Sequence, residues 1–140
     1  MDTSNITVND PLKALIVDDE VDICFLLSGI LRQKQMKPSF VNTLASAKQS
    51  LQQDIPSILF LDNHLPDGFG LDFIQYVKQN YPAIKIVMIT AHDGLTERKK
   101  AQAEGADLFI SKPFTRDVID YAIKNCCKLP LVSALFLYNL

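Results

Sequence analysis

Five residues whose side chains could do chemistry stand directly after short apolar runs: Asp18, Asp19, Asp62, Thr90 and Lys112. Three carboxylates brought to one place repel one another, and their ionised forms need a counter-charge. A hard divalent cation such as Mg²⁺ supplies that charge, because Mg²⁺ prefers oxygen ligands and is usually bound by a few carboxylates rather than a full protein cage. A lysine and a hydroxyl are suitable partners for the oxygens of a phosphoryl group. The residue types therefore indicate Mg²⁺-dependent phosphoryl chemistry, provided that the fold brings the five together.

Each of these residues also has a plainer interpretation when it is taken alone. Asp18 and Asp19 could cap the helix that follows them, and Asp62 could begin a turn. Thr90 is a β-branched residue that suits a strand, and Lys112 could be a solvated loop lysine. These separate roles do not explain why all five residues follow apolar runs, so their shared position favours a common site.

The elements that must position these residues are five apolar runs that alternate with five stretches of helical periodicity. The expected strands are 12–17, 39–41, 58–61, 84–89 and 107–110. The apolar residues that repeat at helical spacing are Ile23, Leu26, Leu27, Ile30 and Leu31, then Leu44, Ala47 and Leu51, then Leu71, Ile74 and Val77, and finally Val118, Ile119, Ala122, Ile123 and Cys126. The remaining helix, 96–104, has almost only alanine to bury, so we expect it to be weakly packed.

Local signals predict where these helices begin and end. We expect Pro38 to stop the first helix and Gly105 to stop the fourth. The expected N-terminal caps are Asn42 or Thr43 for the second helix, Thr96 for the fourth and Thr115 for the last.

Strands that are apolar along their whole length are typical of a parallel sheet that is covered by helices on both faces. The alternation of strands and helices therefore predicts an α/β fold, a three-layer sandwich with five strands and five helices. Right-handed crossovers reduce the topologies to the doubly wound ones, among which we expect the flavodoxin-like strand order 2-1-3-4-5. That order has its switch point between the first and third strands, where Asp18, Asp19 and Asp62 would converge.

Composition bounds the class of protein. The chain has 140 residues, 48% hydrophobic and 21% charged, which is typical of one globular domain. We expect a polar N-terminal arm at 1–11, the domain at 12–127 and an apolar tail at 128–140. The net charge of −2 does not indicate binding to nucleic acid or to an anionic membrane. We find no signal peptide and no membrane span, and we expect Cys24, Cys126 and Cys127 to act as small hydrophobes in a reducing, cytoplasmic compartment.

The combined motifs resemble a known family. Asp18-Asp19, Asp62 followed by Leu65-Pro66-Asp67-Gly68, Thr90-Ala91 and Lys112-Pro113-Phe114 together resemble the receiver domain of two-component response regulators. The resemblance extends over roughly 12–127 and is to single-domain receivers of the chemotaxis-regulator kind. It implies a phosphoprotein of phosphorelay signal transduction, in which Asp62 accepts a phosphoryl group from a histidine kinase or histidine phosphotransfer protein with Mg²⁺ as cofactor.

The resemblance also implies roles for the residues around Asp62. Asp19 and Asp62 would bind the metal directly, Asp18 would bind it through water, and the backbone carbonyl of His64 would complete the protein ligands. Lys112 would pair with the phosphoryl oxygens, and Thr90, which precedes Ala91, would move to hydrogen-bond one of them. Phe109 has the position of the family's rotating aromatic residue, and the Lys112–Pro113 peptide bond is a candidate cis bond. Such a protein is a switch that catalyses its own phosphorylation and dephosphorylation, and it is no enzyme acting on other substrates.

The output that this resemblance implies is a protein contact. We expect the surface of the fourth helix, the fifth strand and the last helix to change and to bind a downstream protein or a second copy of the chain. Arg98, Lys99 and Lys100 would lie near Asp107, Asp117 and Asp120 in such a fold and could pair across that contact, although a solvated charged face is the simpler interpretation. Only 13 residues follow Cys127, which leaves no room for a helix-turn-helix module, so we expect no direct DNA binding. The apolar tail could instead pack on the domain or mediate dimerisation.

The two histidines, His64 and His92, follow Asp62 and Thr90 by two residues each. In a receiver fold both side chains should overhang the phosphorylation site, where they could tune dephosphorylation. Histidine has an ordinary pKa of about 6.5, so this tuning would depend on pH.

Four alternatives compete with this interpretation. A receiver-like scaffold that binds partners without phosphorylation would not need the full set of Asp18, Asp19, Asp62, Thr90 and Lys112. The receiver part of a larger regulator remains open. A flavodoxin-like electron carrier lacks support, because no Gly/Ser/Thr-rich phosphate loop follows the first strand and the chain has no tryptophan. A haloacid-dehalogenase-type phosphatase would need an Asp-x-Asp motif, which is absent.

Overall fold

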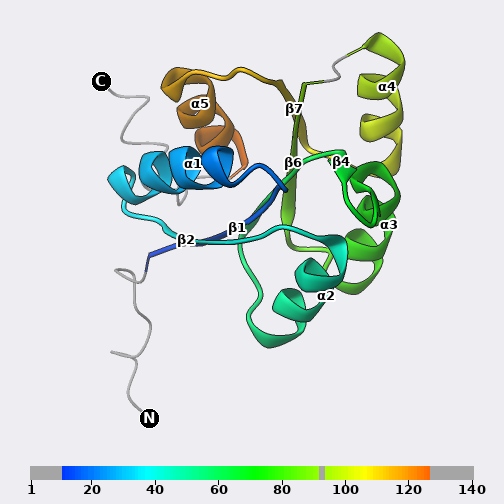
Figure 1. Ribbon diagram of the computed structural model, residues 1–140, viewed down its shortest axis with the longest axis horizontal. Coiled ribbons are helices and arrows are strands. Elements are labelled where there is room, and N and C mark those ends of the chain that lie inside the picture. Colours follow the sequence, from blue (N-terminus) through cyan, green and yellow to red (C-terminus); the bar gives the residue numbers. More distant parts are fainter. Residues whose placement is uncertain (1–10, 92–93, 127–140) are drawn as a thin grey trace, which may run out of the picture.

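The computed structural model describes residues 11–91 and 94–126. Its elements follow one another in the expected alternation of strands and helices (Figure 1). The strands are β1 (Lys13–Val17), β2 (Lys37–Val41), β3 (Ile58–Leu61), β4 (His64–Leu65), β5 (Gly68–Phe69), β6 (Lys85–Thr90) and β7 (Leu108–Ser111). The helices are α1 (Val21–Gln33), α2 (Leu44–Gln53), α3 (Gly70–Asn80), α4 (Leu95–Glu104) and α5 (Arg116–Cys126).

The main sheet has five parallel strands in the order β2-β1-β3-β6-β7. Since β6 and β7 are its fourth and fifth strands, this is the flavodoxin-like order 2-1-3-4-5, and the predicted fold class is confirmed. The short β4 and β5 form a separate antiparallel pair after β3, which the sequence did not predict. Strands of two residues each are too short to leave a periodic pattern.

The core has two halves, one on each face of the sheet, because successive strand side chains point to opposite faces. Along β1, Ala14 and Ile16 pack with residues of α1 and α5, whereas Leu15 and Val17 pack with residues of α2, α3 and α4. All five residues from Ala14 to Asp18 are buried. Strands that are buried on both faces are rigid, so the residues at their carboxyl ends are held in fixed positions.

The end of α1 differs from the prediction. The helix stops at Gln33, and Gln35 adopts a left-handed backbone with φ of 62°, so the chain reverses before Pro38 is reached. Pro38 lies inside β2, which is an edge strand of the sheet and therefore tolerates a residue without a backbone N–H. Its expected role as a helix stop is wrong.

Two of the predicted helix caps are confirmed and one is wrong. The Thr43 hydroxyl oxygen accepts a hydrogen bond from the Ser46 N–H at 3.0 Å, and that of Thr115 accepts one from the Val118 N–H at 3.2 Å. Thr96 does not cap α4, because the helix begins at Leu95 with Gly94 as its N-cap and no side-chain hydrogen bond there. Gly105 ends α4 as expected, in the left-handed region with φ of 114°.

The helices bury nearly the expected faces. In α5 the residues Ile119, Ala122 and Cys126 are buried, but Val118 is 38% exposed, and in α1 Leu26 is 53% exposed, so the expectation that these two lie on the buried faces is wrong. In α4 only Ala101 is buried, which confirms that little apolar packing holds this helix. No helix in the described ranges is both long and apolar enough to cross a membrane. Residues 1–10 of the expected arm, the whole expected tail and Cys127 lie outside the described residues.

Candidate functional site

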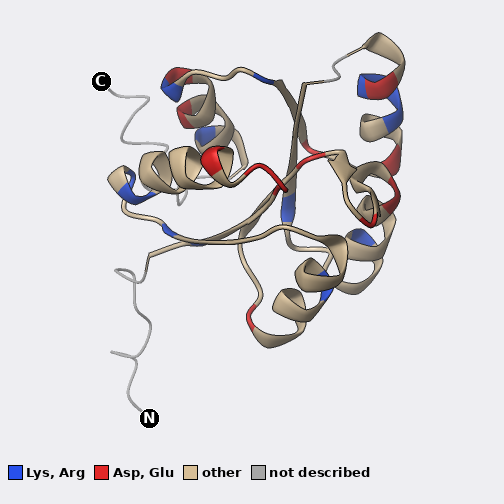
Figure 2. Cartoon of the chain, viewed as in Figure 1, with Lys and Arg blue, Asp and Glu red and all other residues tan. Residues whose placement is uncertain are grey.

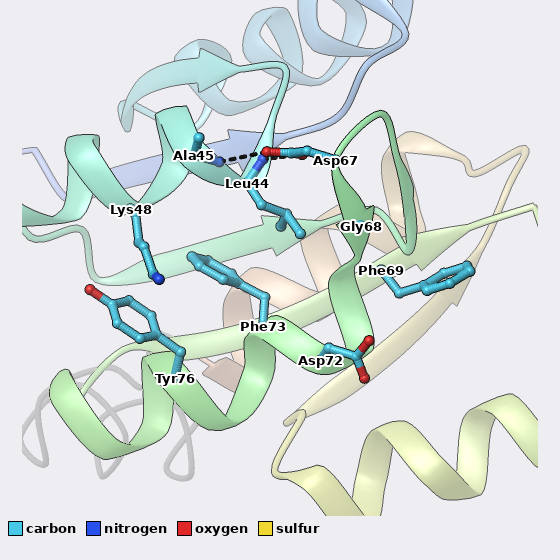
Figure 3. A pocket seen from close by; sticks show the side chains of 9 residues that line it. All are labelled: Leu44, Ala45, Lys48, Asp67, Gly68, Phe69, Asp72, Phe73 and Tyr76. Carbon is cyan, nitrogen blue, oxygen red and sulfur yellow. Dashed lines mark hydrogen bonds between the residues drawn. The ribbon is translucent and has the colours of Figure 1, made fainter.

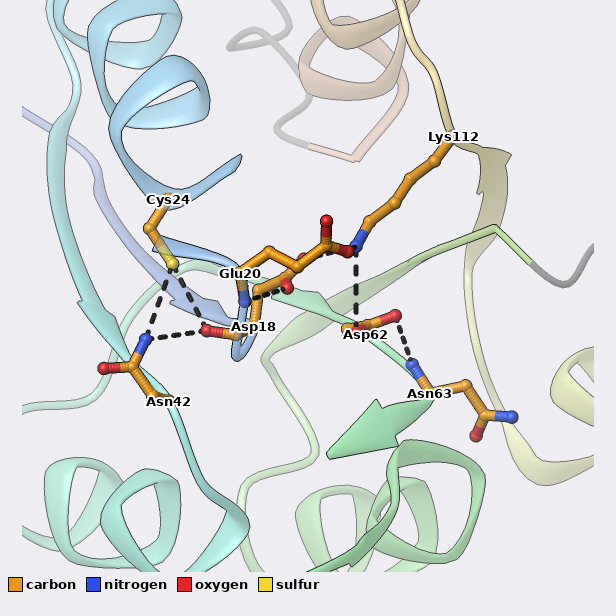
Figure 4. A network of polar contacts seen from close by, with 7 residues as sticks. All are labelled: Asp18, Glu20, Cys24, Asn42, Asp62, Asn63 and Lys112. Atoms are coloured by element: carbon orange, nitrogen blue, oxygen red, sulfur yellow. Dashed lines mark hydrogen bonds and ion pairs between the residues drawn. The ribbon is translucent and has the colours of Figure 1, made fainter. Parts of the chain in front are cut away.

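The carboxyl ends of three strands bring Asp18, Asp62 and Lys112 together (Figure 4). Asp18 follows β1 directly, Asp62 follows β3, and Lys112 follows β7. The Lys112 Nζ lies 2.8 Å from Asp18 Oδ2 and 3.7 Å from Asp62 Oδ2. Parallel strands end at the same edge of a sheet, which is why residues so far apart in the sequence meet there.

Asp18 is buried and held by several hydrogen bonds. Its Oδ1 accepts one from the Glu20 N–H at 2.9 Å. Its backbone carbonyl accepts from Asn42 Nδ2 at 2.8 Å and from the Cys24 thiol at 3.3 Å. Burial raises the pKa of Asp18 despite the opposing effect of Lys112, and burial beside Asp18 raises the pKa of Cys24 to about 11. The Asp18 carboxylate is therefore held in place, and the Cys24 thiol is a donor to the Asp18 backbone carbonyl and no nucleophile.

Asp62 is an acid whose pKa is strongly raised by its surroundings. Its Oδ1 accepts a hydrogen bond from the Asn63 N–H at 2.9 Å, and its side chain is 6% exposed. Burial and the nearby charge of Asp18 raise its pKa to about 6, against the lowering effect of Lys112. Two buried carboxylates whose pKa values are both raised favour any cation that can be placed beside them.

Lys112 supplies one such positive charge. Burial alone would lower the pKa of Lys112, but hydrogen bonds to Asp18 and Glu20 outweigh burial and raise it, so the ammonium stays protonated. The Lys112–Pro113 peptide bond is cis, as expected, and the Lys112 N–H donates to the Thr90 carbonyl at 2.9 Å. This hydrogen bond holds the backbone of Lys112 beside the end of β6.

The acidic group can accommodate a metal ion. Carboxylate oxygens of Asp18, Asp19, Glu20 and Asp62 all lie within 4.8 Å of one another. Figure 2 shows the acidic stretch after β1 running up to the acidic end of β3. Hard oxygen donors with excess negative charge are the ligand set that Mg²⁺ prefers. The donor chemistry therefore fits the expected cofactor.

Glu20 is the member of this group that the sequence did not assign. Its Oε1 lies 2.8 Å from Lys112 Nζ. The available sequence signal was that Glu20 directly follows Asp18 and Asp19. The direction in which a long flexible side chain points cannot be predicted from residue spacing.

The other predicted site residues lie around this centre. Thr90 is buried at the end of β6, and Ala91 next to it is exposed. Phe109 is partly buried, with the Arg98 guanidinium 4.9 Å from its ring centroid. The exposed His64 ring packs edge-on against Phe69, with centroids 5.6 Å apart. His92 lies outside the described residues.

The loop after Asp62 is tightly constrained. The Asn63 carbonyl and side-chain oxygens accept hydrogen bonds from the N–H groups of Gly70 and Leu71 at 2.8 and 3.0 Å. A Cβ on Gly70 would lie 2.2 Å from the Asp62 carbonyl oxygen, so only glycine fits there. The position of Asp62 thus depends on a glycine that follows it by eight residues.

Asp67, which follows Asp62 by five residues, connects this loop to α2. Its two carboxylate oxygens accept hydrogen bonds from the Leu44 and Ala45 N–H groups at 2.9 and 3.0 Å, which lowers its pKa (Figure 3). It lines a groove of about 460 Å³ between α2 and α3, whose wall includes Lys48 and Tyr76. This groove contains none of the acidic group around Asp62.

Arg98, Lys99 and Lys100 were expected to pair with Asp107, Asp117 and Asp120 only across a contact with another molecule, and two of these acids have other partners in the described part of the chain. Asp107 pairs with Lys78 at 3.1 Å, and Asp120 pairs with Lys34 at 2.7 Å and with Lys124. Arg98 instead donates to Ser111 Oγ at 3.0 Å.

A five-stranded parallel α/β sandwich with an acidic group, a threonine and a lysine at the carboxyl edge of its sheet defines a class of signalling domain. Residues 14–124 match the family model described as the response regulator receiver domain. The chain belongs to this family, and the resemblance drawn from its motifs is confirmed.

Individual relatives agree with the family. The chain is 38% identical over 101 residues to response regulator protein PilR of Pseudomonas aeruginosa, covering 72% of this chain and 23% of PilR. The receiver domain of the NtrC4 dimer, solved in its beryllofluoride-activated form, is 33% identical with a TM-score of 0.78, covering 81% of this chain and 94% of that one. The receiver domain of a putative LuxO repressor protein from Vibrio parahaemolyticus has a TM-score of 0.80 at 24% identity, covering 84% and 91%.

The curated relatives are much longer than this chain. The chain spans 23% of PilR and 25% of the LuxO proteins that it matches. The similarity therefore shows the family of this chain and does not assign it the activities of those whole proteins.

Proposed function

We propose that this receiver domain is switched by phosphorylation of Asp62, with a histidine kinase or histidine phosphotransfer protein as the donor. The supporting observation is the surroundings of the Asp62 carboxylate. It is buried at a strand end, with the Lys112 ammonium 3.7 Å away and the oxygens of Asp18, Asp19 and Glu20 beside it. Attack of a carboxylate on a phosphoryl donor needs positioning and charge neutralisation more than a general base.

Each neighbour of Asp62 has a role in this proposal. One Asp62 oxygen forms the new bond to phosphorus as the donor's bond to phosphorus breaks. Lys112 and the Thr90 hydroxyl then hold the phosphoryl oxygens, beside the backbone of Ala91. Asp19, Asp62 and the His64 carbonyl would hold Mg²⁺ directly, with Asp18 acting through water. When bound, Mg²⁺ neutralises charge on the acids and on the phosphoryl group.

The proposed output is a protein contact. Rearrangement of Thr90 and Phe109 changes the surface of α4, β7 and α5, which binds a downstream protein or a second copy of the chain. The same site catalyses loss of the phosphoryl group, and the proposed location is the cytoplasm.

The acceptor is tested with acetyl phosphate, Mg²⁺ and intact-mass spectrometry. Wild type should gain one phosphoryl group and Asp62→Asn none, because the amide cannot accept it. Asp67→Asn is the matched control, since it removes a carboxylate from the same loop and should label as wild type does. Labelling that survives Asp62→Asn would disprove the assignment, and unlabelled wild type would favour the unphosphorylated scaffold.

We also propose that His64 and His92 set the lifetime of the phosphorylated form. Decay of labelled wild type is compared with that of a His64→Ala/His92→Ala variant at about pH 6 and 8, the range in which histidine changes charge. The variant should decay at a different rate and lose the pH dependence. Identical rates and pH profiles would show that the two histidines play no part.

The receiver part of a larger regulator is the second candidate. The observation that favours it is the length of the relatives, since the chain covers 23% of PilR. Sequencing of the flanking coding region distinguishes this candidate from a stand-alone receiver.

A further inference from the structure

An ion pair joins two loops across the mouth of the site. Glu20 belongs to the β1–α1 loop and Lys112 to the β7–α5 loop, 92 residues apart, and Oε1 lies 2.8 Å from Nζ. Nζ is equally close to Asp18 Oδ2 but lies 3.7 Å from Asp62 Oδ2 (Figure 4). The ammonium is therefore closer to Asp18 and Glu20 of the β1–α1 loop than to the proposed acceptor.

The Glu20 carboxylate does not serve the helix that it precedes. A residue at the N-cap usually accepts a hydrogen bond from a first-turn N–H. Glu20 is the N-cap of α1 and makes no such side-chain bond. Its backbone N–H supports Asp18, and its carboxylate reaches across to Lys112 instead.

The two acids that bind Lys112 differ in how easily they can be replaced. The Asp18 side chain is 3% exposed, and its Oδ1 is held by the Glu20 N–H. The Glu20 side chain is 59% exposed, so it can turn into water at little cost in solvation. A new anion on Asp62 would therefore displace Glu20 from the lysine and leave Asp18 in place.

We propose that Glu20 is a positioning residue that competes with the phosphoryl group for the Lys112 ammonium. In the unphosphorylated protein it holds Nζ toward the β1–α1 loop. On phosphorylation the lysine exchanges the Glu20 carboxylate for a phosphoryl oxygen. This inference rests on the proposed acceptor role of Asp62, and it adds a residue that limits how tightly the phosphoryl group is held.

The first test measures binding of beryllium fluoride, a phosphoryl mimic, at saturating Mg²⁺. Glu20→Gln should bind it about three- to tenfold more tightly than wild type, because the charge that competes for Lys112 is gone. Asp22→Asn is the matched control: it removes one charge from the same end of α1, and no contact to Lys112 is found for Asp22, so it should bind as wild type does. Equal affinity in Glu20→Gln and wild type, or an equal gain in Asp22→Asn, would overturn the proposal.

The second test asks whether Glu20 acts through Lys112. The acetyl phosphate labelling rate is measured for wild type, Glu20→Gln, Lys112→Gln and the double variant, which form a double-mutant cycle. Glu20→Gln should speed labelling only when Lys112 is present. An equal gain in the Lys112→Gln background would mean general charge repulsion and would refute the lysine contact.

A third measurement separates this role from metal binding. Mg²⁺ affinity should fall sharply in Asp19→Asn and much less in Glu20→Gln. An equal loss in both would make Glu20 a metal ligand and overturn the inference. Failure of the proposed function is distinct from all of these outcomes, since wild type itself would then not be labelled at Asp62.

Discussion

Asp62 combines the properties that a phosphoryl acceptor needs and that a stable fold does not favour. Its carboxylate is buried beside that of Asp18, and both pKa values are raised. The folded state therefore binds the Asp62 proton more tightly than the unfolded state does. The contribution of this group to stability is greatest when the proton is bound, and it declines as pH rises from about 4 through about 6.

This linkage predicts the effect of removing the charge. Without metal, Asp62→Asn should be more stable than wild type by roughly 3 kcal/mol at about pH 7.5, and the difference should close as pH falls toward 4. Urea unfolding in the presence of a chelator, followed across this pH range, measures it. Asp67→Asn should behave oppositely, because the pKa of Asp67 is lowered and its contribution is lost as pH falls. A wild type as stable as Asp62→Asn at neutral pH would contradict the raised pKa.

Sequence reasoning succeeded for residues whose positions depend on the backbone. Asp18, Asp62 and Lys112 each follow a strand and Thr90 ends one, and the order of the parallel strands brings these strand ends to one edge of the sheet. It missed the pairing of Glu20 with Lys112, because that contact depends on the direction of a flexible side chain and on a lysine 92 residues away. For the same reason it did not predict that the Asp67 carboxylate caps α2 from another loop.

At the scale of elements, α4 is held by polar and aromatic contacts more than by apolar burial. Arg98 donates to Ser111 Oγ at 3.0 Å, and its guanidinium lies 4.9 Å from the centroid of Phe109. Both partners belong to β7, directly before Lys112. Arg98 therefore links the helix to the strand whose aromatic residue is expected to move on phosphorylation.

Arg98→Ala should loosen this link. A cation–π contact and a hydrogen bond at a partly exposed site together contribute about 1 kcal/mol, so amide exchange in α4 should become about fivefold faster. Lys99→Ala is the control, because Lys99 is exposed on the same helix and should leave exchange unchanged. Hydrogen exchange followed by mass spectrometry measures both. Equal protection of α4 in wild type and Arg98→Ala would show that this contact does not hold the helix.

At two helix boundaries the structure differs from what the local sequence signals predicted. Thr96 is a good cap by type, yet α4 starts one residue before it, at Leu95. Pro38 was expected to end α1, but the left-handed Gln35 had already turned the chain toward β2. The identities of the five main strands and of the four helices other than α4, in contrast, followed from apolar runs and apolar periodicity, because both faces of the sheet must be covered.

At the scale of the whole molecule, β7 is an edge strand with α4 on one face of the sheet and α5 on the other (Figure 1). Both helices expose large apolar residues there, with Leu95 67% and Tyr121 61% exposed. Exposed apolar residues beside an edge strand suit a protein contact. Ile55, at 58% exposed, precedes β3 at the opposite end of the sheet's strands and offers a matched apolar residue outside this surface.

We predict that activation promotes self-association through α4, β7 and α5. Sedimentation with Mg²⁺ and beryllium fluoride should show a larger species than sedimentation without them. Leu95→Lys and Tyr121→Lys should each weaken that species by about tenfold or more, because a buried lysine at the centre of a contact costs over 1 kcal/mol. Ile55→Lys should not weaken it. A protein that stays monomeric when activated, or one in which truncation after Lys128 alone abolishes the larger species, would contradict the assignment of the contact to this surface.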